Sequence, residues 1–455
     1  RAAGRLPPNG AARPPAPSFA NWTAGGRRRK LSRGMKRSLL LPLALLLAAM
    51  PSPPARSAPP PDAGGEGSPG QAPAARKARL LAHWKLTKDG RDASGNGNHG
   101  IPHAVRFATA EHRKSAQFDG RQSWLEVPPS PSLRLGTGDF TLAAWVRLPA
   151  EAEQDDVFGD IVSRFDPATR RGFNFRISLN AGVTTSQANA RTVHFGIDDG
   201  RLEPHWTDHG RPGEAVLIFG LATHDGELYA ATCEPAPGRA GRVYRFGGGT
   251  NWVDCGPPAP CNAVSALAEF QGALYAGVSR YRLAGSALPE SPNTNAGGKV
   301  FRYRGGQAWE DCGPLPGSET VGGLVVYRGQ LYASALYPPA GFFRFEGGRR
   351  WTALPTPGRR VLALCVYDGQ LFASSYDEAH VFRFDGTGWT DCGQVGPLEN
   401  TQTYSFAIYE GRLCVGTWKT GRVYGYRGDH NWEDLGRLGG ELEVMGMLVH
   451  NGMLY

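Results

Sequence analysis

Four oxygen-bearing side chains in the first third of the chain are of the kind that bind a hard cation. Asp92, Asn96 and Asn98 lie within one short segment, and Asp119 follows it in the sequence. Carboxylate and amide oxygens are the ligands that calcium prefers in proteins. The same segment is also typical of a tight loop, because its Gly and Asn residues tolerate positive φ and Asn bonds its own backbone. Two interpretations therefore stay open, a calcium site or a structural loop, and calcium is the one cofactor that the sequence suggests.

Arginines recur at one position of a repeated pattern in the second half of the chain. A ring of guanidinium groups could bind an anionic ligand through bidentate contacts. The structural alternative pairs each arginine with an aspartate of the adjoining strand. We favour this alternative, because equivalent positions of a repeat usually serve the repeat itself. The arginines are Arg245, Arg302, Arg344 and Arg383, and the aspartates are Asp254, Asp311 and Asp391.

All seven cysteines of the chain lie in this second half. Cys255 and Cys261 could close a small disulfide loop around the prolines between them, as an exported protein would allow. Cys255, Cys312 and Cys392, in contrast, occupy one position of the repeat, which would hold them apart. No histidine stands at zinc-ligand spacing beside them, so we expect separate buried thiols rather than a metal cluster.

Catalytic motifs are harder to find, and we predict no catalytic residue. Hydrolysis of a glycoside usually needs two carboxylates about 5 to 10 Å apart. The acidic segment 151–156 lies in an apparent loop that lacks the alternating apolar positions of a catalytic strand. The repeats lack the Ser-x-Asp-x-Gly-x-x-Trp box of sialidases, and no Ser-His-Asp order, phosphate loop or His-Glu-x-x-His motif stands out.

The elements that must position these residues come from a repeat of about 40 residues. Each unit has an apolar run, a turn that ends in Gly, a Leu-Tyr-Ala strand, an alternating strand and an outer strand that opens with Trp. An insert at 283–298, rich in Pro, Ser, Asn and Gly, lengthens one unit. A four-stranded unit of this kind cannot bury both faces alone, so the pattern predicts a β-propeller. The turn glycines are Gly226, Gly272, Gly329, Gly369, Gly411 and Gly452.

The repeat begins and ends on partial units. An outer-strand motif, Trp206-Thr-Asp208-His-Gly210, precedes the first complete unit, and the chain stops at Tyr455 within a Leu-Tyr motif. A half-unit at the start suggests that an early strand completes the last blade when the ring closes. We therefore expect a six- or seven-bladed propeller in a sequence that is a fragment at its C-terminus.

A resemblance to known families extends the prediction of the fold. The repeats resemble kelch-like repeats. Six segments upstream of them, including the alternating strand Phe140-Thr-Leu-Ala-Ala-Trp-Val146, are in order similar to the laminin-G-like family with its concanavalin A-like jelly roll. That resemblance implies a two-sheet sandwich that binds glycans or protein surfaces, often with calcium. The six segments are 80–86, 92–100, 116–120, 124–128, 130–133 and 139–146.

The laminin-G-like pattern runs only to about residue 200. The family's later Trp-x-His-Val strand and Leu-Tyr-Val-Asp-Gly hairpin do not occur in the remaining residues. Either the sandwich is degenerate, or the propeller is inserted in it and the missing strands lie beyond Tyr455. We favour insertion, because half a sandwich would expose unpaired edges. The predicted fold class is thus all-β: a jelly-roll sandwich, 80–200, with propeller repeats, 201–455, inserted in it.

The N-terminal segments look like targeting and linker sequence. Met35-Lys-Arg37 and the apolar stretch 39–50 predict a secretory signal peptide over 35–57. The apolar stretch itself is too short to span a bilayer comfortably. Residues 1–34 are expected to lie outside the natural protein, and 58–79 to be a disordered linker of Pro, Gly and Ala. The formal net charge of +9 becomes −1 without the ten basic residues of 1–37, so no nucleic-acid partner is expected.

These observations predict a secreted, periplasmic or cell-surface protein of bacterial type, with no membrane span after cleavage of the signal peptide. Its expected function is non-catalytic binding of carbohydrate or protein, for adhesion or recognition, and its expected partner is a glycan or an extracellular protein surface. The alternative is a secreted glycan-active hydrolase, glycosidase or sialidase-like, that uses the propeller or the jelly roll, because both folds host such enzymes.

Overall fold

A computed structural model of the chain describes most of the residues after position 79. The described residues are 45–48, 79–110, 113–119, 122–136, 138–147, 160–166, 168–180, 189–201, 207–285, 288–437, 439–450 and 453–455. The described residues all belong to one compact unit, 39–455. The upstream segment 1–34, nearly all of the signal and linker segments, the acidic segment 151–156, Trp206 and Gly452 lie outside the described residues. Within these described residues, no helix is long and apolar enough to cross a membrane.

The N-terminal described region consists of small antiparallel sheets. In the first sheet, β1 (Leu45–Ala48) lies between β2 (Leu80–Trp84) and β7 (Thr141–Ala144). Strand β1 therefore comes from the apolar stretch that the sequence assigns to a signal peptide. The other pairs and sheets are β3 (Ile101–His103) with β6 (Trp124–Glu126), β4 (Arg106–Ala110) with β5 (Arg113–Gln117), and β8 (Asp160–Asp166), β9 (Arg171–Asn180) and β10 (Asn189–Asp199) in the order β10-β9-β8.

A small apolar core supports these strands. Ala82, Trp84, Leu86 and Ala116 are buried, and the Trp84 Nε1–H donates to the carbonyl oxygen of Asn98 at 2.7 Å. The region is all-β, as predicted. The two-sheet jelly roll that the laminin-G resemblance implies is not established by these separate sheets, and its limits at 80 and 200 stay predictions.

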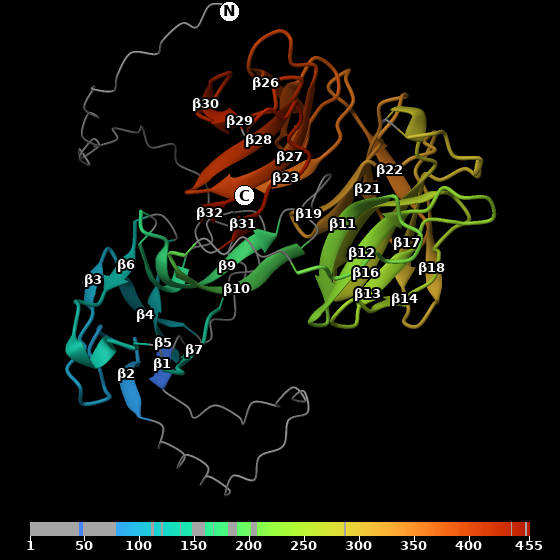
Figure 1. The fold of residues 1–455 in the computed structure, drawn as a ribbon. Coiled ribbons are helices and arrows are strands. Elements are labelled where there is room, and N and C mark those ends of the chain that lie inside the picture. Colours follow the sequence, from blue (N-terminus) through green and yellow to red (C-terminus); the bar gives the residue numbers. More distant parts are fainter. Residues whose placement is uncertain are drawn as a thin grey trace, which may run out of the picture. The chain divides into compact units, whose positions relative to one another are not determined.

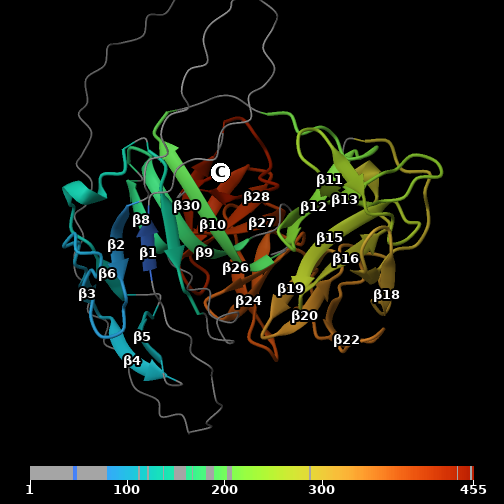
Figure 2. The same cartoon turned by 90° about the horizontal axis from the view of Figure 1, so that it is seen from below.

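Five four-stranded antiparallel units follow one another in the described residues of the second half, from green to red in Figures 1 and 2, and a bridge between Cys233 and Ala263 joins the first two units into one eight-stranded sheet. We call them blades 1 to 5. Their strands are β11 (Leu217–His224), β12 (Glu227–Cys233), β13 (Val243–Phe246) and β14 (Trp252–Asp254); β15 (Ala263–Phe270), β16 (Ala273–Ser279), β17 (Lys299–Tyr303) and β18 (Trp309–Pro314); β19 (Gly323–Tyr327), β20 (Gln330–Ser334), β21 (Phe342–Phe345) and β22 (Trp351–Leu354); β23 (Leu364–Tyr367), β24 (Gln370–Ser374), β25 (His380–Phe384) and β26 (Trp389–Gln394); and β27 (Gln402–Tyr409), β28 (Arg412–Trp418), β29 (Arg422–Tyr426) and β30 (Trp432–Arg437).

The strand order within every blade is that of a β-propeller, and the first strands of successive blades contact one another. A last hairpin, β31 (Val449–His450) with β32 (Met453–Leu454), packs with Val444 and Met447 on blade 5. The predicted insert lies between β16 and β17 and includes the short 3₁₀ helix η3 (Leu283–Gly285). The propeller-like, all-β architecture is therefore confirmed, while the total number of blades stays a prediction.

The predicted turn glycines connect the first two strands of each blade. Gly329 has φ of 68°, and Arg328 before it has φ of 49°. Two successive residues with positive φ define a type I′ turn, whose twist matches that of the flanking strands. The same pair of positive φ values occurs at the other four described turns, so the Gly positions set the hairpin register throughout the repeat.

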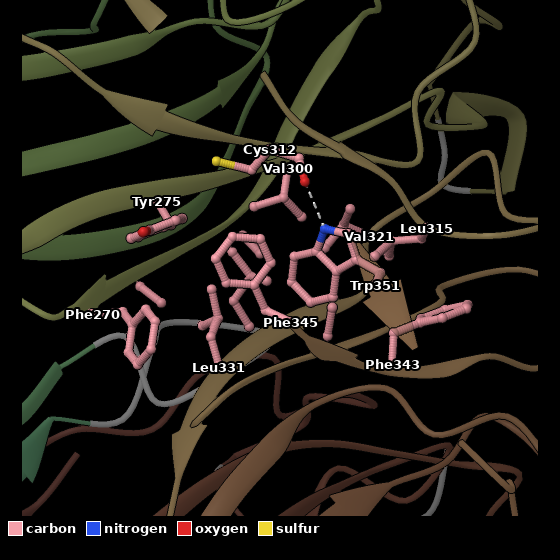
Figure 3. Close-up of a cluster of buried hydrophobic side chains, with 14 of the residues drawn as sticks. Phe270, Tyr275, Val300, Cys312, Leu315, Val321, Leu331, Phe343, Phe345 and Trp351 are labelled. Atoms are coloured by element: carbon pink, nitrogen blue, oxygen red, sulfur yellow. Dashed lines mark hydrogen bonds between the residues drawn. The ribbon is translucent and has the colours of Figure 1, made fainter. Parts of the chain in front are cut away.

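The apolar cores lie between blades rather than within them. One cluster combines Phe270 and Tyr275 of blade 2 with Phe343, Phe345 and Trp351 of blade 3 (Figure 3). Three further clusters join blades 1 and 2, 3 and 4, and 4 and 5 in the same way. Each blade therefore stabilises its neighbour, as expected for a repeat that cannot bury its own faces.

The outer-strand tryptophans bond each blade to the residues just before it. The Nε1–H of Trp351 donates to the carbonyl oxygen of Cys312 in blade 2 at 2.9 Å, the dashed line in Figure 3. The other tryptophans repeat this contact at 2.8 to 2.9 Å. The pairs are Trp252 with His209, Trp309 with Cys255, Trp389 with Pro355, and Trp432 with Cys392. The bond from Trp252 to His209 explains the outer-strand motif upstream of blade 1.

Replacement of Trp351 tests this link between blades. We expect Trp351→Phe to lower the free energy of unfolding by about 1–3 kcal/mol, because the Cys312 carbonyl loses its donor and the buried ring becomes smaller. Trp252→Phe is the matched control, because the bond of Trp252 to His209 lies in an exposed setting. Denaturant unfolding of the two variants would contradict the account if their losses were equal.

Candidate functional site

Aromatic side chains gather where the second strands of the blades end. Strands β16, β20, β24 and β28 run in the same direction within equivalent blades, so their C-terminal ends lie at the same end of the repeat array. Each is followed or closed by an aromatic residue: Tyr281, Tyr337, Tyr376 and Trp418. We call this region the tyrosine end. None of these four side chains is fully buried.

Contacts between blades bring the phenol rings together. The rings of Tyr281 and Tyr337 stack with their centroids 6.3 Å apart. Tyr404, which lies on the first strand of blade 5, meets Tyr376 of blade 4 edge to face at 5.1 Å. The backbone N–H of Arg282 donates to the Tyr337 hydroxyl at 3.1 Å. The tyrosine end therefore contains two contacting pairs of phenols, one from blades 2 and 3 and one from blades 4 and 5.

A carboxylate, Glu443, joins these phenols from the segment after blade 5. Its backbone forms an antiparallel bridge with Trp418, and the N–H of Val444 donates to the carbonyl of Thr417 at 3.2 Å. These backbone contacts tie Glu443 to the end of β28. Its side chain is exposed, which makes it accessible to a ligand.

The phenols stay protonated at neutral pH. Burial raises the pKa of Tyr404 above its usual value, and the neighbouring Tyr376 and the Glu443 carboxylate raise it further. The pKa of Tyr376 is also raised, first by burial and then by Tyr281 and the Glu443 charge. The Tyr404 hydroxyl donates to the Gln402 Oε1 at 2.5 Å. This end of the blades therefore combines neutral phenols, which can donate protons, with one exposed carboxylate.

A second carboxylate lies beside Tyr376 but is already neutralised. Arg360 donates to Asp377 through its backbone N–H at 2.7 Å, its Nε at 2.9 Å and a terminal guanidinium nitrogen at 2.6 Å. Burial opposes ionisation of Asp377, but the Arg360 contacts prevail and lower the pKa of this carboxyl. Asp377 is consequently an ionised partner of Arg360 and has no proton to donate at neutral pH.

The four residues predicted to bind calcium are only partly brought together. Asp92, Asn96 and Asn98 lie in one loop against β2, where both amide nitrogens donate to the Leu81 carbonyl at 3.0 and 2.8 Å. Asp119 lies in a different turn and accepts from the backbone of Gln122 and Ser123. Among the described residues, no group of three His, Cys, Asp or Glu side chains is placed to hold a metal ion. A calcium ion stays a prediction.

The Asp92 carboxylate has loop donors on both of its oxygens. Oδ1 accepts from the N–H groups of His83 and Ser94 at 2.9 and 2.8 Å, and Oδ2 accepts from Asn98 N–H at 3.0 Å and the Ser94 hydroxyl at 2.8 Å. Burial raises the pKa of Asp92, but these bonds outweigh it, so the net shift is downward. This geometry accounts for the loop without an ion.

The expected pairing of arginines with aspartates is wrong. Arg245 lies opposite Val253 in the strand register, while Asp254 lies opposite Tyr244, so the two side chains point to opposite faces of the sheet. Arg245 instead meets Glu227 at 3.1 Å, and Arg242 takes Asp254 at 2.6 Å. Arg344, Asp311 and Asp391 likewise have other partners, namely Glu346, Arg349 and His380.

The aspartates of the outer strands serve the turns that follow them. Asp254 Oδ1 accepts from the Gly256 N–H at 2.7 Å, and Asp311 and Asp391 make the same bond two residues on. These repeated aspartates therefore make structural contacts, which differ from the predicted pairs with arginine.

The cysteines behave as separate buried thiols. All seven are buried, and Cys255 and Cys261 are not joined in a disulfide. Burial raises the pKa of Cys261 and of Cys312 to about 11. Thiols of this kind are poor nucleophiles at neutral pH, so they do not extend the candidate site.

Comparisons with known proteins reach the fold only. No family model matches the chain, and no curated protein matches it. A catalytically inactive virginiamycin B lyase from Staphylococcus aureus with quinupristin is 12% identical, covers 64% of this chain and 88% of its own, and has a TM-score of 0.43. A streptogramin B lyase is 9% identical, covers 66% of this chain and 93% of its own, and has a TM-score of 0.41. The extracellular domain of a putative hybrid two-component system from B. thetaiotaomicron is 14% identical, covers 65% of this chain and 39% of its own, and has a TM-score of 0.38.

These neighbours have propeller-type folds, in agreement with the blades described above. The prediction of a non-catalytic binding protein is corrected here, because the solved structures that resemble the chain include lyases, which are enzymes. Since the likeness is to the fold alone, a substrate and a reaction have to be argued from the side chains.

The tyrosine end was not identified from the sequence. Its aromatic residues follow the Leu-Tyr-Ala strands at unequal spacings, so they do not share one repeat position. The available signal was an aromatic residue within a few positions after each such strand. Glu443 gave no signal, because it lies outside every repeated motif.

Replacement of Asp92 separates the structural loop from a calcium site. We expect Asp92→Ala to lower the free energy of unfolding by about 1–3 kcal/mol, because buried backbone donors lose their acceptor. Since the pKa of Asp92 is lowered in the folded state, its contribution is present above its unfolded pKa of about 3.9 and is lost as the pH falls through the folded value. The variant and the parent should therefore converge in acid.

Denaturant unfolding at several pH values, with calcium or with EDTA, measures this. Asp89→Ala is the control, because Asp89 is half-exposed and its contacts are with one exposed residue, Arg91, whose N–H donates to it at 3.1 Å and whose guanidinium lies 3.9 Å away. A shift of the unfolding midpoint on addition of calcium, absent in Asp92→Ala, would contradict the purely structural loop.

Proposed function

We propose that the protein is an exported enzyme that cleaves a glycan at the tyrosine end. The observation that carries the proposal is the backbone bridge between Glu443 and Trp418, which ties an exposed carboxylate to the end of the blades where the rings of Tyr376 and Tyr404 meet. Groups with shifted pKa values are common at active sites, and burial together with the Glu443 charge raises the pKa of both tyrosines. Export is part of the proposal and rests on the signal-like segment 35–57.

In the proposed reaction, Glu443 is the proton acceptor. It takes a proton from a water molecule whose oxygen bonds to the anomeric carbon of the sugar. The Tyr376 hydroxyl gives its proton to the glycosidic oxygen as the bond from that oxygen to the anomeric carbon breaks. The proton on Glu443 then returns through water to the phenolate of Tyr376, so one water is consumed in each turnover.

A phenol is assigned the donor role because the neighbouring carboxyl cannot fill it. Asp377 is held ionised by Arg360, as its lowered pKa indicates. Tyr376 keeps part of its surface exposed, whereas Tyr404 is only 7% exposed, so Tyr376 is assigned the contact with the sugar. Tyr404 accordingly serves to position Glu443 and Tyr376 rather than to react.

Replacement of Glu443 tests the assignment of the proton acceptor. We expect Glu443→Gln to lower kcat by roughly 10²- to 10⁴-fold, because a general base contributes about that factor. The assay measures reducing ends released from a panel of neutral and acidic polysaccharides. Glu441→Gln is the matched control, because it removes an exposed carboxylate from the same segment. Equal activity of the two variants would contradict the proposal.

The pH profile tests the assignment of the proton donor. Because the pKa of Tyr376 is raised above the usual value of about 10, its protonated form should persist beyond that pH. We therefore expect no loss of kcat from ionisation of Tyr376 below pH ~10. Tyr376→Phe should lower kcat more than KM. A variant with unchanged kcat would exclude Tyr376 as the donor.

A further inference from the structure

Cationic side chains lie against the aromatic rings of the tyrosine end. The Arg282 guanidinium carbon lies 4.9 Å from the ring centroid of Tyr337. The Lys419 Nζ lies 5.2 Å from that of Trp418, and the Arg360 guanidinium carbon lies 5.7 Å from that of Tyr376. These distances are within the range of cation–π attraction. The aromatic rings Tyr337, Tyr376 and Trp418, from three successive blades, therefore each have a cation against them.

The three cations differ in how their charge is balanced. Arg360 is paired with Asp377, as described above. Arg282 and Lys419 are exposed, and the part of the chain that the structure describes supplies neither with an ion-pair partner. Other arginines of the same loops and of the strand after Lys419 do have such partners: Arg280 with Glu319, Arg359 with Glu378, and Arg422 with Asp434. The positive charges of Arg282 and Lys419 are therefore available to bind an anionic ligand.

The chemistry of these two loops fits a sugar acid. Arg282 and Lys419 lie over the rings of Tyr337 and Trp418, so these ring faces are already covered. The exposed guanidinium and ammonium groups are the parts that can bind a carboxylate of a sugar. Arg282 and Lys419 belong to blades 2 and 5, so each would meet one charge of a chain rather than share a single multiply charged group. Glu443 would repel such a substrate, and the two cations would offset that repulsion.

We propose that the substrate of the tyrosine end is a glycan that carries carboxylates, such as a polyuronate, and that Arg282 and Lys419 bind those carboxylates. This inference rests on the proposed function of the same site. It adds the class of substrate and two residues that determine specificity.

Binding to an inactive variant tests the inference apart from catalysis. Oligogalacturonate and its methyl ester are the probes, because they share one sugar chain and differ in charge. With Glu443→Gln, calorimetry should give at least tenfold tighter binding of the charged oligomer. When Arg282→Gln and Lys419→Gln are introduced into the Glu443→Gln variant, the preference for the charged oligomer should disappear. The affinity for the methyl ester should stay unchanged. Arg280→Gln is the control, because Arg280 is already paired with Glu319.

Each outcome has one meaning. Equal affinity for acid and ester, or no binding of the acid, overturns the inference. Tighter binding of a sulfated oligosaccharide than of the uronate also overturns it, because the cations would then select sulfate. If the wild-type protein cleaves neutral and acidic glycans at equal rates, the proposed enzymatic function stands. The proposed preference for carboxylate-bearing substrates is then overturned. A preference for the acid in a wild-type protein that turns nothing over supports the binding site and overturns the catalytic proposal.

Discussion

A four-stranded blade has two apolar faces, and neither can be covered from within the blade. The structure resolves this through contact between neighbours, because every apolar cluster of the repeat region joins two blades or joins blade 5 to the last hairpin. The tryptophan N–H bonds add direction to this nondirectional packing, since each indole reaches a backbone carbonyl just before its own blade. The relative placement of blades, and of any residue at their ends, depends on this interlock.

The tyrosine end follows from the interlock. Hairpins of equal register carry the ends of the second strands to one place, and the packed blades hold them there. The loops beyond those ends do not follow the repeated sequence pattern, and their residues are not required for the packing of the blades. Phenols from different blades can then approach within contact distance, and Glu443 reaches them through a backbone bridge to Trp418. A rigid array with variable loops is the usual basis of a catalytic or binding site.

Local chemistry made much of the fold predictable from the sequence. Gly329 and its equivalents predicted the hairpins, because a type I′ turn requires positive φ, and the Trp and Cys positions predicted the outer strands. The partners of Arg245 were not predictable from its spacing, because one residue of strand register reverses the face on which a side chain lies. The site was missed for a related reason: the ring contacts of Tyr281 with Tyr337 and of Tyr376 with Tyr404 form only when blades pack, which no local pattern encodes.

The central claim is that a sugar is bound and cleaved among the phenols and Glu443. A crystal structure of the full chain carrying Glu443→Gln, grown with a uronate oligosaccharide, tests it most directly. The account predicts a sugar ring beside Tyr376, its glycosidic oxygen within hydrogen-bond distance of that hydroxyl, and its carboxylates near Arg282 and Lys419. An oligosaccharide bound on another surface, with the tyrosine end free of sugar, would contradict it.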